Sequence, residues 1–401
     1  MNPRLDALAP YPFERLAALL RDITPSREHD PISLAIGEPR HAPARAACEA
    51  LVAQLDGVAH YPSTRGSEAL RAAIGDWLSN RFNIARQSID AERHILPAAG
   101  TREALFSFAQ AVVDPSKSGA AVAMPNPGYQ IYEGATLLAG AEPLYLPCLP
   151  ETDFLADLDA LEPADWDRVQ LLYLCSPGNP TGAVADRAYF ERALALAEKH
   201  DFVIASDECY SEIYADEAAP PVGLLDVAHA QGRADFERCV VFHSLSKRSN
   251  LPGLRSGFVA GDGRVLGEFL RYRTYHGATL GHHVQAASIA AWRDEAHVRD
   301  NRARYREKYD AVMPLLEPLC DVARPPGSFY LWPAFDTSDE ELARAALRDQ
   351  NLKVVPGRYL ARKVNGFNPG ENRLRLSLVV ETHDCVEAIN RLARVCESLA
   401  V

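Results

Sequence analysis

The sequence predicts an α/β protein built around a largely parallel sheet. Between residues 66 and 260, short apolar runs alternate with helical stretches, and a polar or Gly/Pro-rich loop follows each run. The clearest runs are at 120–124, 170–175, 202–206 and 239–243. Ligands of such sheets bind at the carboxyl ends of the strands. Functional residues are therefore expected directly after these runs.

Further elements flank this region on both sides. Residues 12–23 have the pattern of an amphipathic helix that begins near Pro12, and residues 284–320 read as nearly continuous helix. A short apolar stretch lies at 32–36. Three strands are expected at 329–332, 353–355 and 374–380, and two helices at 338–350 and 382–399. Together these segments predict a smaller α+β unit.

The length and the composition limit the possible organisation and partners. A chain of 401 residues is long enough for two domains. We expect a large domain over 46–290 and a small domain over 1–45 and 291–401 that includes an N-terminal arm. The net charge of −12 argues against sequence-independent binding to nucleic acid. No apolar run reaches the roughly 20 residues of a membrane helix.

Cysteine and histidine usage gives a prediction about metals and location. The eight cysteines form no CxxC pair, which favours reduced thiols in a cytoplasmic protein over a zinc site or a disulfide framework. His276, His282 and His283 have no acidic or thiol partner at ligand spacing. No metal is therefore expected.

A lysine flanked by hydroxyl groups stands just after one predicted strand. Ser244-Leu245-Ser246-Lys247 follows the run at 239–243, and Arg255 lies eight residues beyond Lys247. A lysine amine in such a place can form an imine with an aldehyde. Ser244 and Arg255 could bind a phosphate group. The alternative is that Lys247 is a solvated loop charge.

An acidic side chain stands just after the run at 202–206. Asp207 could pair with the pyridinium nitrogen of a cofactor and keep that nitrogen protonated, so that the ring withdraws electrons from a carbanion. Tyr210 could donate a hydrogen bond to a phenolate oxygen on the same ring. The alternative is that Asp207 only caps a following helix.

Three more motifs have the composition of ligand-binding turns and strands. The rigid turn SPGNPTG at 176–182 presents Asn179 in a fixed direction. The segment AGTR at 99–102 opens a helix, whose free N–H groups and threonine hydroxyl suit a phosphate. Arg373 and Arg375 alternate on a strand, so they are either solvated together or aimed together at a carboxylate.

In their order along the chain, these motifs resemble the fold-type-I aminotransferases of class I/II, which depend on pyridoxal 5′-phosphate. The matching segments are AIGEP at 35–39, YPSTRGSEALRAAI at 61–74, AAGTREALF at 98–106, PNPGYQIY at 125–132, SPGNPTG at 176–182, SDECYSEIY at 206–214, SLSKRSNLPGLRSGF at 244–258, PPGSFYLW at 325–332 and RLRLSL at 373–378. The resemblance covers essentially the whole chain. It implies a large domain with a mostly parallel sheet of seven strands, and a smaller α+β domain.

The resemblance also implies which residues bind the cofactor. Lys247 would bind the aldehyde, Asp207 the pyridinium nitrogen, and Asn179 and Tyr210 the phenolate oxygen. Tyr129 would stack on the ring. The phosphate would be held by Gly100, Thr101, Arg102, Ser244 and Arg255.

Further implied roles concern the substrate and the partner subunit. Arg375, not Arg373, would bind the α-carboxylate of the substrate, with help from Gly37 and Asn179. Lys247 would also serve as the general base, with Asp207 and Tyr210 completing the catalytic set. Tyr61 would reach the cofactor phosphate of a neighbouring subunit, which implies a homodimer with shared active sites.

Three segments point to a narrower group. The sequences at 247–262, 275–288 and 366–379 resemble bacterial succinyldiaminopimelate aminotransferases. That resemblance implies N-succinyl-L,L-diaminopimelate as amino donor and 2-oxoglutarate as acceptor. We expect 275–288 and 366–372 to line the far end of the substrate. The candidate cations for its distal carboxylates are Arg40, Arg65, Arg273 and Arg358.

Other functions remain open at this point. An aminotransferase of aspartate, alanine or N-acetylornithine type, or a carbon–sulfur lyase, would keep Lys247 unchanged. A non-catalytic sensor domain of a transcription regulator would need an N-terminal DNA-binding unit, whereas here the aminotransferase pattern begins near residue 35.

Overall fold

The computed structural model describes residues 1–399, and its main sheet has seven strands in the order β2-β8-β7-β6-β5-β3-β4. Only β8 runs antiparallel to its neighbours. The strands are β2 (Ile95–Ala98), β3 (Ala121–Asn126), β4 (Glu142–Pro147), β5 (Val169–Cys175), β6 (Val203–Asp207), β7 (Cys239–Ser244) and β8 (Gly257–Gly261). This confirms the predicted α/β class and the mostly parallel sheet. The four apolar runs correspond to β3, β5, β6 and β7.

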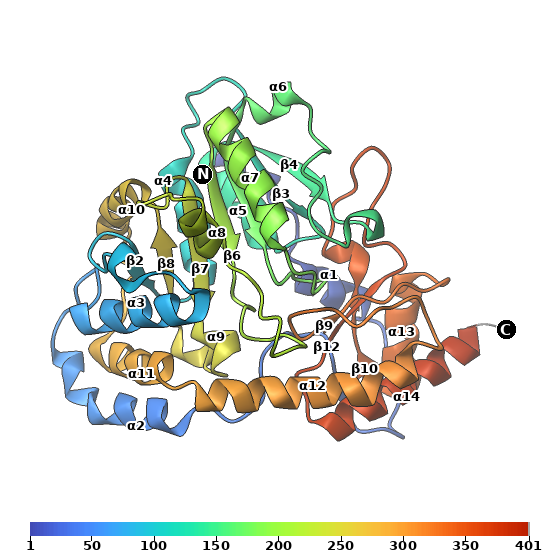
Figure 1. Cartoon of the computed structure of the whole chain (residues 1–401). Helices are drawn as coiled ribbons and strands as arrows, with labels where there is room; N and C mark the ends of the chain where they lie inside the picture. The colour runs from blue at the N-terminus through green and yellow to red at the C-terminus, as the bar shows by residue number, and fades with distance from the viewer. Residues whose placement is uncertain (400–401) are drawn as a thin grey trace.

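Helices cover both faces of this sheet (Figure 1), which explains why its strands are apolar on both sides. In β7, Val240 and Phe242 pack on one face and Cys239 and Val241 on the other. The first face is covered by α4 (Thr101–Val112), α5 (Gln130–Ala139) and α10 (Gly263–His276). The second face is covered by α3 (Glu68–Phe82), α7 (Arg187–His200), α8 (Leu224–Ala230) and α11 (His282–Arg293).

A second hydrophobic core lies beside the first and is formed by the C-terminal part of the chain with residues 32–34. Its helices are α12 (Ala296–Leu316), α13 (Asp339–Gln350) and α14 (Thr382–Leu399). Its strands are β9 (Tyr330–Leu331), β11 (Val355–Pro356) and β12 (Leu374–Ser377) in one sheet, and β1 (Ile32–Ser33) paired with β10 (Leu352–Lys353) in another. The domain boundaries 46–290, 1–45 and 291–401 remain a prediction.

The predicted helix at 284–320 is wrong as one element. The structure divides it into α11 and α12, because Asp294 takes an extended conformation with φ −102° and ψ 111°. The Asp294 carboxylate then accepts a hydrogen bond from the backbone N–H of Ala296 at 2.8 Å, at the start of α12. The break lets α11 pack on α2 (Arg45–Ala53) while α12 packs on α14.

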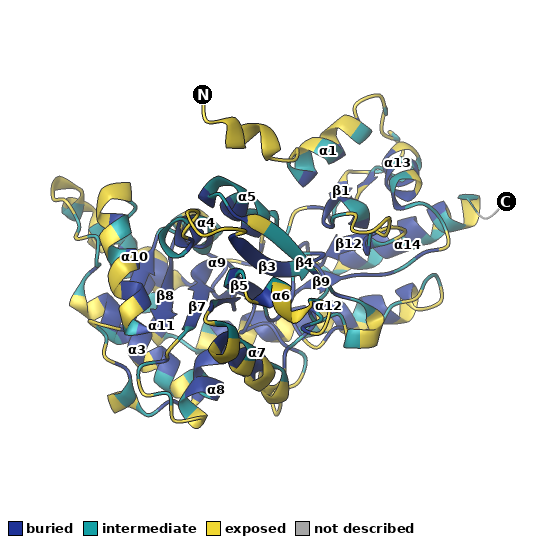
Figure 2. Cartoon of the chain, turned by 90° about the horizontal axis from the view of Figure 1, so that it is seen from above, coloured by how far each residue is buried: buried dark blue, intermediate teal, exposed yellow. Residues whose placement is uncertain are grey.

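The remaining elements are short. They are α1 (Pro12–Leu19), α6 (Pro163–Trp166) and α9 (Leu245–Arg248), together with several 3-10 turns. The turn Pro3–Ala7 has no buried residue and lies outside the body of the protein (Figure 2). Among the helices within residues 1–399, none combines the length and the apolar character needed to span a membrane.

Candidate active site

The carboxyl ends of β5, β6 and β7 open into one cavity of about 500 Å³. Both cores contribute to its walls, since β12 and the segment after β1 face the ends of the large sheet. Except for Gly100 and Tyr61, all of the residues predicted to bind the cofactor or the α-carboxylate line this cavity. They are Gly37, Thr101, Arg102, Tyr129, Asn179, Asp207, Tyr210, Ser244, Lys247, Arg255 and Arg375.

Lys247 lies in α9, the single helical turn that follows β7. Its Nζ donates a hydrogen bond to the carbonyl oxygen of Gly37 and lies 5.4 Å from the centre of the Phe329 ring. The pKa of Lys247 is lowered to about 8, mainly by burial and also by the neighbouring Arg375, while Cys209 and Glu38 act in the opposite direction. The amine therefore loses its proton far more easily than an exposed lysine, as a nucleophile or a base requires.

Asp207 is the last residue of β6 and is only 5% exposed. Its Oδ2 accepts a hydrogen bond from the hydroxyl of Tyr132 at 2.8 Å, and its Oδ1 accepts one from the backbone N–H of Cys209 at 3.3 Å. Burial raises the pKa of this carboxyl, and the two hydrogen bonds oppose that rise. The alternative that Asp207 caps a helix is wrong, because the residues after it form turns.

Asn179 and Arg375 meet at another wall of the cavity. Arg375 Nη1 donates to Asn179 Oδ1 at 3.1 Å, and Arg375 Nη2 donates to the carbonyl oxygen of Ala35 at 2.8 Å. Arg373 lies elsewhere: it donates to the carbonyl oxygen of Trp332 and its guanidinium lies over the ring of Phe154. The two arginines are therefore not aimed at one carboxylate, and Arg375 is the one that lines the cavity.

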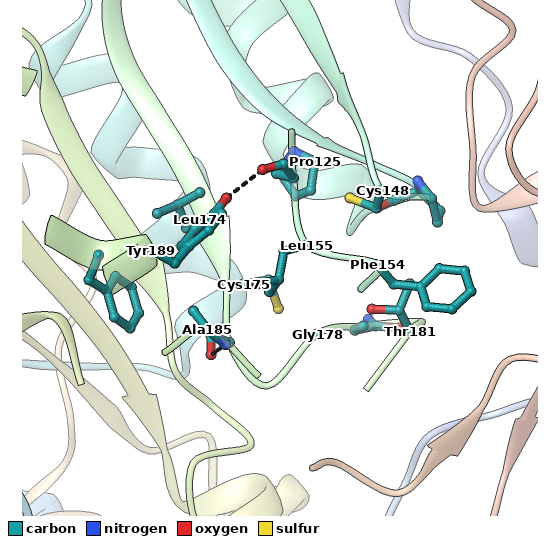
Figure 3. Close-up of a pocket in the computed structure, with 15 residues that line it drawn as sticks. Pro125, Cys148, Phe154, Leu155, Leu174, Cys175, Gly178, Thr181, Ala185 and Tyr189 are labelled. Atoms are coloured by element: carbon teal, nitrogen blue, oxygen red, sulfur yellow. Dashed lines mark hydrogen bonds between the residues drawn. The ribbon is translucent and has the colours of Figure 1, made fainter. Parts of the chain in front are cut away.

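A separate hollow of about 20 Å³ is lined by the turn that contains Gly178 and Thr181 (Figure 3). Figure 3 shows the side chains of Cys148, Cys175 and Phe154 around it. Its volume admits about one water molecule. The larger cavity is thus the one of these two that can hold an organic cofactor and its substrate.

One end of the larger cavity can bind an anion. Gly100 has φ +84° at the start of α4, and a Cβ added there would lie 2.1 Å from Arg255 Nη2. The guanidinium of Arg255 thus lies close to the helix N-terminus, where backbone N–H groups are free. Ser244 and Thr101 line the cavity beside them. Arg102 has another contact, since its Nε donates to the hydroxyl of Tyr129 at 2.8 Å.

Comparison with known proteins identifies the family. The profile of the family described as aminotransferase class I and II matches residues 29–392. The chain is 33% identical over 400 residues to the LL-diaminopimelate aminotransferase of Nitratidesulfovibrio vulgaris, with 98% of each chain covered. The chain belongs to the class I and II aminotransferases. This aminotransferase therefore depends on pyridoxal 5′-phosphate, as its family does.

Solved structures of aminotransferases share its fold. An aminotransferase from Neisseria meningitidis superposes with a TM-score of 0.94 at 44% identity, covering 98% of this chain and 99% of the other. A probable N-succinyldiaminopimelate aminotransferase from Thermus thermophilus superposes with a TM-score of 0.84 at 26% identity, covering 96% and 99%. These neighbours confirm the predicted fold-type-I architecture.

The side chains of this aminotransferase fit pyridoxal 5′-phosphate at three points. The α4 N-terminus with Ser244 and Arg255 suits a phosphate. The buried carboxylate of Asp207 accepts hydrogen bonds from the Tyr132 hydroxyl and the Cys209 N–H, and a protonated ring nitrogen would supply the cation that such a carboxylate favours. The Lys247 amine suits an aldehyde.

Several contacts in this aminotransferase were not predicted. The hydroxyl of Tyr330 lies 3.0 Å from that of Tyr210, and it approaches Gly37 so closely that a Cβ there would lie 2.0 Å away. Glu38 lines the cavity as its second carboxylate after Asp207. Tyr330 and Glu38 stand inside segments that resemble the family, but neither has a local pattern that marks it as a site residue.

Of the residues expected at the far end of the substrate, Arg273 and Arg358 form ion pairs within this chain, and none of the candidates lines its cavity. Arg273 is 0% exposed and donates twice to the carboxylate of Glu103, while Arg358 pairs with Asp339. Arg40 and Arg65 are not in the cavity wall either. The segments 275–288 and 366–372 contribute no lining residue. Tyr61 is 102% exposed, so its predicted role concerns a partner subunit and remains a prediction.

Proposed function

We propose that this aminotransferase transfers an amino group from N-succinyl-L,L-2,6-diaminopimelate to 2-oxoglutarate. The products are N-succinyl-2-amino-6-oxopimelate and glutamate. The observation that carries the proposal is the charge of the cavity wall. It holds four cationic side chains, Arg102, Lys247, Arg255 and Arg375, against the carboxylates of Glu38 and Asp207. Arg255 would bind the cofactor phosphate, Lys247 would move the proton and Arg375 would bind the α-carboxylate. Arg102 thus remains as the cation that a further, buried carboxylate of the donor needs.

The chemistry would be divided among a few side chains. Bound pyridoxal 5′-phosphate supplies an aldehyde that takes up amines and a ring that withdraws electrons. Asp207 would hold the proton on the ring nitrogen, and Asn179 and Tyr210 would donate to the phenolate oxygen. Arg375 would bind the α-carboxylate of the donor. Lys247 Nζ would remove the α-proton and return it, because its lowered pKa makes the free amine an effective base near neutral pH.

The phosphate would be held by Gly100, Thr101, Ser244 and Arg255. Arg102 is assigned differently here from the sequence-based expectation. Because its Nε is bound to the Tyr129 hydroxyl, we infer that its guanidinium meets a distal carboxylate of the donor. Tyr129 would then both stack on the cofactor ring and fix Arg102.

A second candidate donor is unsubstituted L,L-diaminopimelate. The relative from Nitratidesulfovibrio vulgaris, at 33% identity, carries that name. Glu38 favours it as well, since a carboxylate in the cavity would attract the free distal ammonium group, which succinylation removes. The sequence segments at 247–262 and 366–379 and the Thermus thermophilus neighbour support the succinylated donor.

A comparison of donors tests the proposal. Purified protein loaded with pyridoxal 5′-phosphate is assayed with 2-oxoglutarate and each of the two diaminopimelate donors, aspartate and alanine. We expect the highest kcat/KM with the succinylated donor. Arg102→Met should lower kcat/KM about tenfold or more for diaminopimelate donors but little for alanine, since a hydrogen bond to a charged group is worth about 1.5–3 kcal/mol. The matched control is Arg40→Met, an arginine outside the cavity wall.

The results separate the two donors. If unsubstituted L,L-diaminopimelate gives the higher kcat/KM and Glu38→Gln reverses the preference, the second candidate is correct. If aspartate or alanine exceeds both, the diaminopimelate assignment is wrong and only the aminotransferase activity remains.

We also propose a cytoplasmic homodimer with shared active sites. Exposed apolar side chains follow one another on α2, on the 3-10 turn after it and just beyond that turn: Val52 is 64% exposed, Val58 69% and Tyr61 102%. Burial of such side chains against a second copy is favourable. The cysteines, which all lie within residues 1–399, are free thiols, as a reducing compartment requires.

A further inference from the structure

A buried chain of polar side chains runs from helix α12 toward the turn that carries Lys247. Lys308 Nζ lies 2.7 Å from His41 Nε2, and His41 Nδ1 lies 2.7 Å from Asn301 Oδ1. Lys308 is 1% exposed, His41 6% and Asn301 4%. Asn301, Tyr305 and Lys308 lie on one face of α12 because they are spaced by four and three residues. The Tyr305 ring packs against His41, with 4.8 Å between ring centres.

Asn301 continues the chain to the main chain of the lysine turn. Its Nδ2 donates to the carbonyl oxygens of Lys247 at 3.4 Å and Arg248 at 3.5 Å. These carbonyls stand at the end of α9, a helix of four residues, where no intrahelical donor is available. Asn250 Nδ2 donates to Asn301 Oδ1 at 3.1 Å and holds the amide in this orientation.

The donors and acceptors fix the protonation state of His41. An ammonium group can only donate, so Lys308 requires a lone pair on His41 Nε2. His41 Nδ1 then carries the proton and donates to Asn301 Oδ1. Burial lowers the pKa of His41, and the nearby Lys308 and Arg304 act in the same direction, against Asn301 and Glu381. Burial also lowers the pKa of Lys308.

The segment 37–41 thus contacts Lys247 directly at Gly37 and reaches it through Asn301 at His41. The carbonyl oxygen of Gly37 accepts a hydrogen bond from Lys247 Nζ. Four residues further on, His41 holds Asn301, which binds the main-chain carbonyl of the same lysine. We propose that His41 and Asn301 are positioning residues that fix Lys247 against this segment, with Lys308 selecting the neutral Nδ1–H form of His41. The proposal rests on the proposed role of Lys247.

Protonation of His41 breaks this arrangement. A proton on Nε2 would face the Lys308 ammonium at hydrogen-bond distance, so the two cations would repel each other. As the pH falls through the lowered pKa of His41, the chain opens and Lys247 loses one of its two supports.

The test uses three variants of the full-length protein loaded with pyridoxal 5′-phosphate. Asn301→Ala removes the amide that binds the Lys247 carbonyl. His41→Asn keeps an N–H donor near the position of Nδ1 but has no group that titrates. Tyr305→Phe is the matched control, because it keeps the ring that packs on His41 and removes a buried hydroxyl without a hydrogen-bond partner among the described residues.

The first readout needs no substrate: it is the pH titration of the visible absorbance of the cofactor bound at Lys247. The second is kcat and KM with the best donor. Asn301→Ala should shift the titration midpoint and lower kcat about tenfold with little change in KM, because displacement of a catalytic group by about 1 Å can cost up to about a hundredfold. His41→Asn should have kcat near that of the wild type at neutral pH. Its pH titration should lack the change at acidic pH that protonation of His41 causes. Tyr305→Phe should match the wild type in both.

The proposal is overturned if Asn301→Ala lowers the melting temperature but leaves both the titration midpoint and kcat unchanged, since the chain would then be only structural. Equal losses of kcat at neutral pH in His41→Asn and Asn301→Ala would also contradict it, because the N–H donor that His41→Asn retains should preserve activity. If Asn301→Ala does not fold, Lys308→Met replaces it. We then expect a smaller shift of the titration midpoint, and the absence of any shift would overturn the proposal. If Lys247→Met shows the same cofactor absorbance as the wild type, the proposed role of Lys247, and with it the proposed function, is contradicted instead.

Discussion

The hydroxyl of Tyr132 donates to Oδ2 of Asp207 at 2.8 Å, and both side chains are buried. Tyr132 is held in place by Tyr173, whose ring stacks on it with 4.7 Å between centres and 15° between planes. Burial alone raises the pKa of Asp207, and the hydrogen bond from Tyr132 lowers it. Tyr132 therefore helps to keep the carboxylate ionised, in the state that pairs with a protonated ring nitrogen.

Tyr132→Phe should weaken this support and lower kcat about tenfold, since a hydrogen bond to a charged group is worth about 1.5–3 kcal/mol. The cofactor absorbance should also titrate at a different pH. Tyr173→Phe is the matched control: it loses a buried hydrogen bond to the carbonyl oxygen of Leu105 and should be destabilised to a similar extent. Equal kcat in the two variants would show that the Tyr132 hydroxyl is only structural.

Gly100→Ala should weaken cofactor binding by displacing Arg255. The new Cβ would lie 2.1 Å from the guanidinium, and φ is +84°. With ψ at 154°, this positive φ lies in a region that is essentially restricted to glycine and costs about 1–3 kcal/mol for a residue with a side chain. Gly232→Ala is the control, because it has φ +77° and no atom within 4 Å of the new Cβ. Both should lower the melting temperature, but only Gly100→Ala should raise the dissociation constant of pyridoxal 5′-phosphate in a fluorescence titration.

The pH dependence of cofactor uptake follows from the pKa of Lys247. Only the neutral amine attacks the aldehyde. The uptake rate of the cofactor-free protein should therefore rise with pH through about 8, the lowered pKa of Lys247, and then level off. Glu38→Gln should move the midpoint to lower pH, since the Glu38 carboxylate raises this pKa. A midpoint near that of free lysine, or a shift to higher pH in Glu38→Gln, would contradict the proposed environment of the amine.

The same pKa affects stability in the cofactor-free protein. The unfolded chain binds the lysine proton up to its ordinary pKa of 10.5, whereas the folded chain releases it near 8. The unfolded state thus holds more protons between these values, so the free energy of unfolding should rise with pH across this window. Urea unfolding of the wild type and of Lys247→Met, which should lack this slope, measures the effect. Lys247→Met should also lose transamination by about a hundredfold or more.

The residues at strand ends could be predicted because local sequence determines them. Lys247, Asp207 and Asn179 each follow an apolar run, and parallel strands bring such positions to one edge. Contacts between distant residues could not be predicted in the same way. Arg273 was a candidate substrate ligand, but its partner Glu103 lies 170 residues away in the sequence.

The chain from His41 to Asn301 is a second example, since these residues are separated by 260 positions. Neither stands in a pattern that suggests a partner. The choice between Arg373 and Arg375 likewise depended on the family resemblance. Alternation along a strand does not show which of the two side chains faces the cavity. Packing against Tyr330 and Asn179 places Arg375 in the cavity wall.

The last prediction concerns the partner subunit. If the partner's Tyr61 completes the active site, then Lys247→Ala and Tyr61→Ala damage different subunits of the same site. A heterodimer of the two variants would contain one site with neither substitution and one site with both. Random exchange makes half of the dimers mixed, so a mixture of the two nearly inactive proteins should recover about a quarter of the wild-type activity.

The assay is run at limiting pyridoxal 5′-phosphate, where loss of a phosphate ligand is most visible. Tyr275→Ala, another exposed tyrosine at 90% exposure, is the control and should be active on its own. No recovery after verified subunit exchange would mean that Tyr61 acts within its own chain or not at all, and light scattering that shows an active monomer of 44.0 kDa would exclude shared sites altogether.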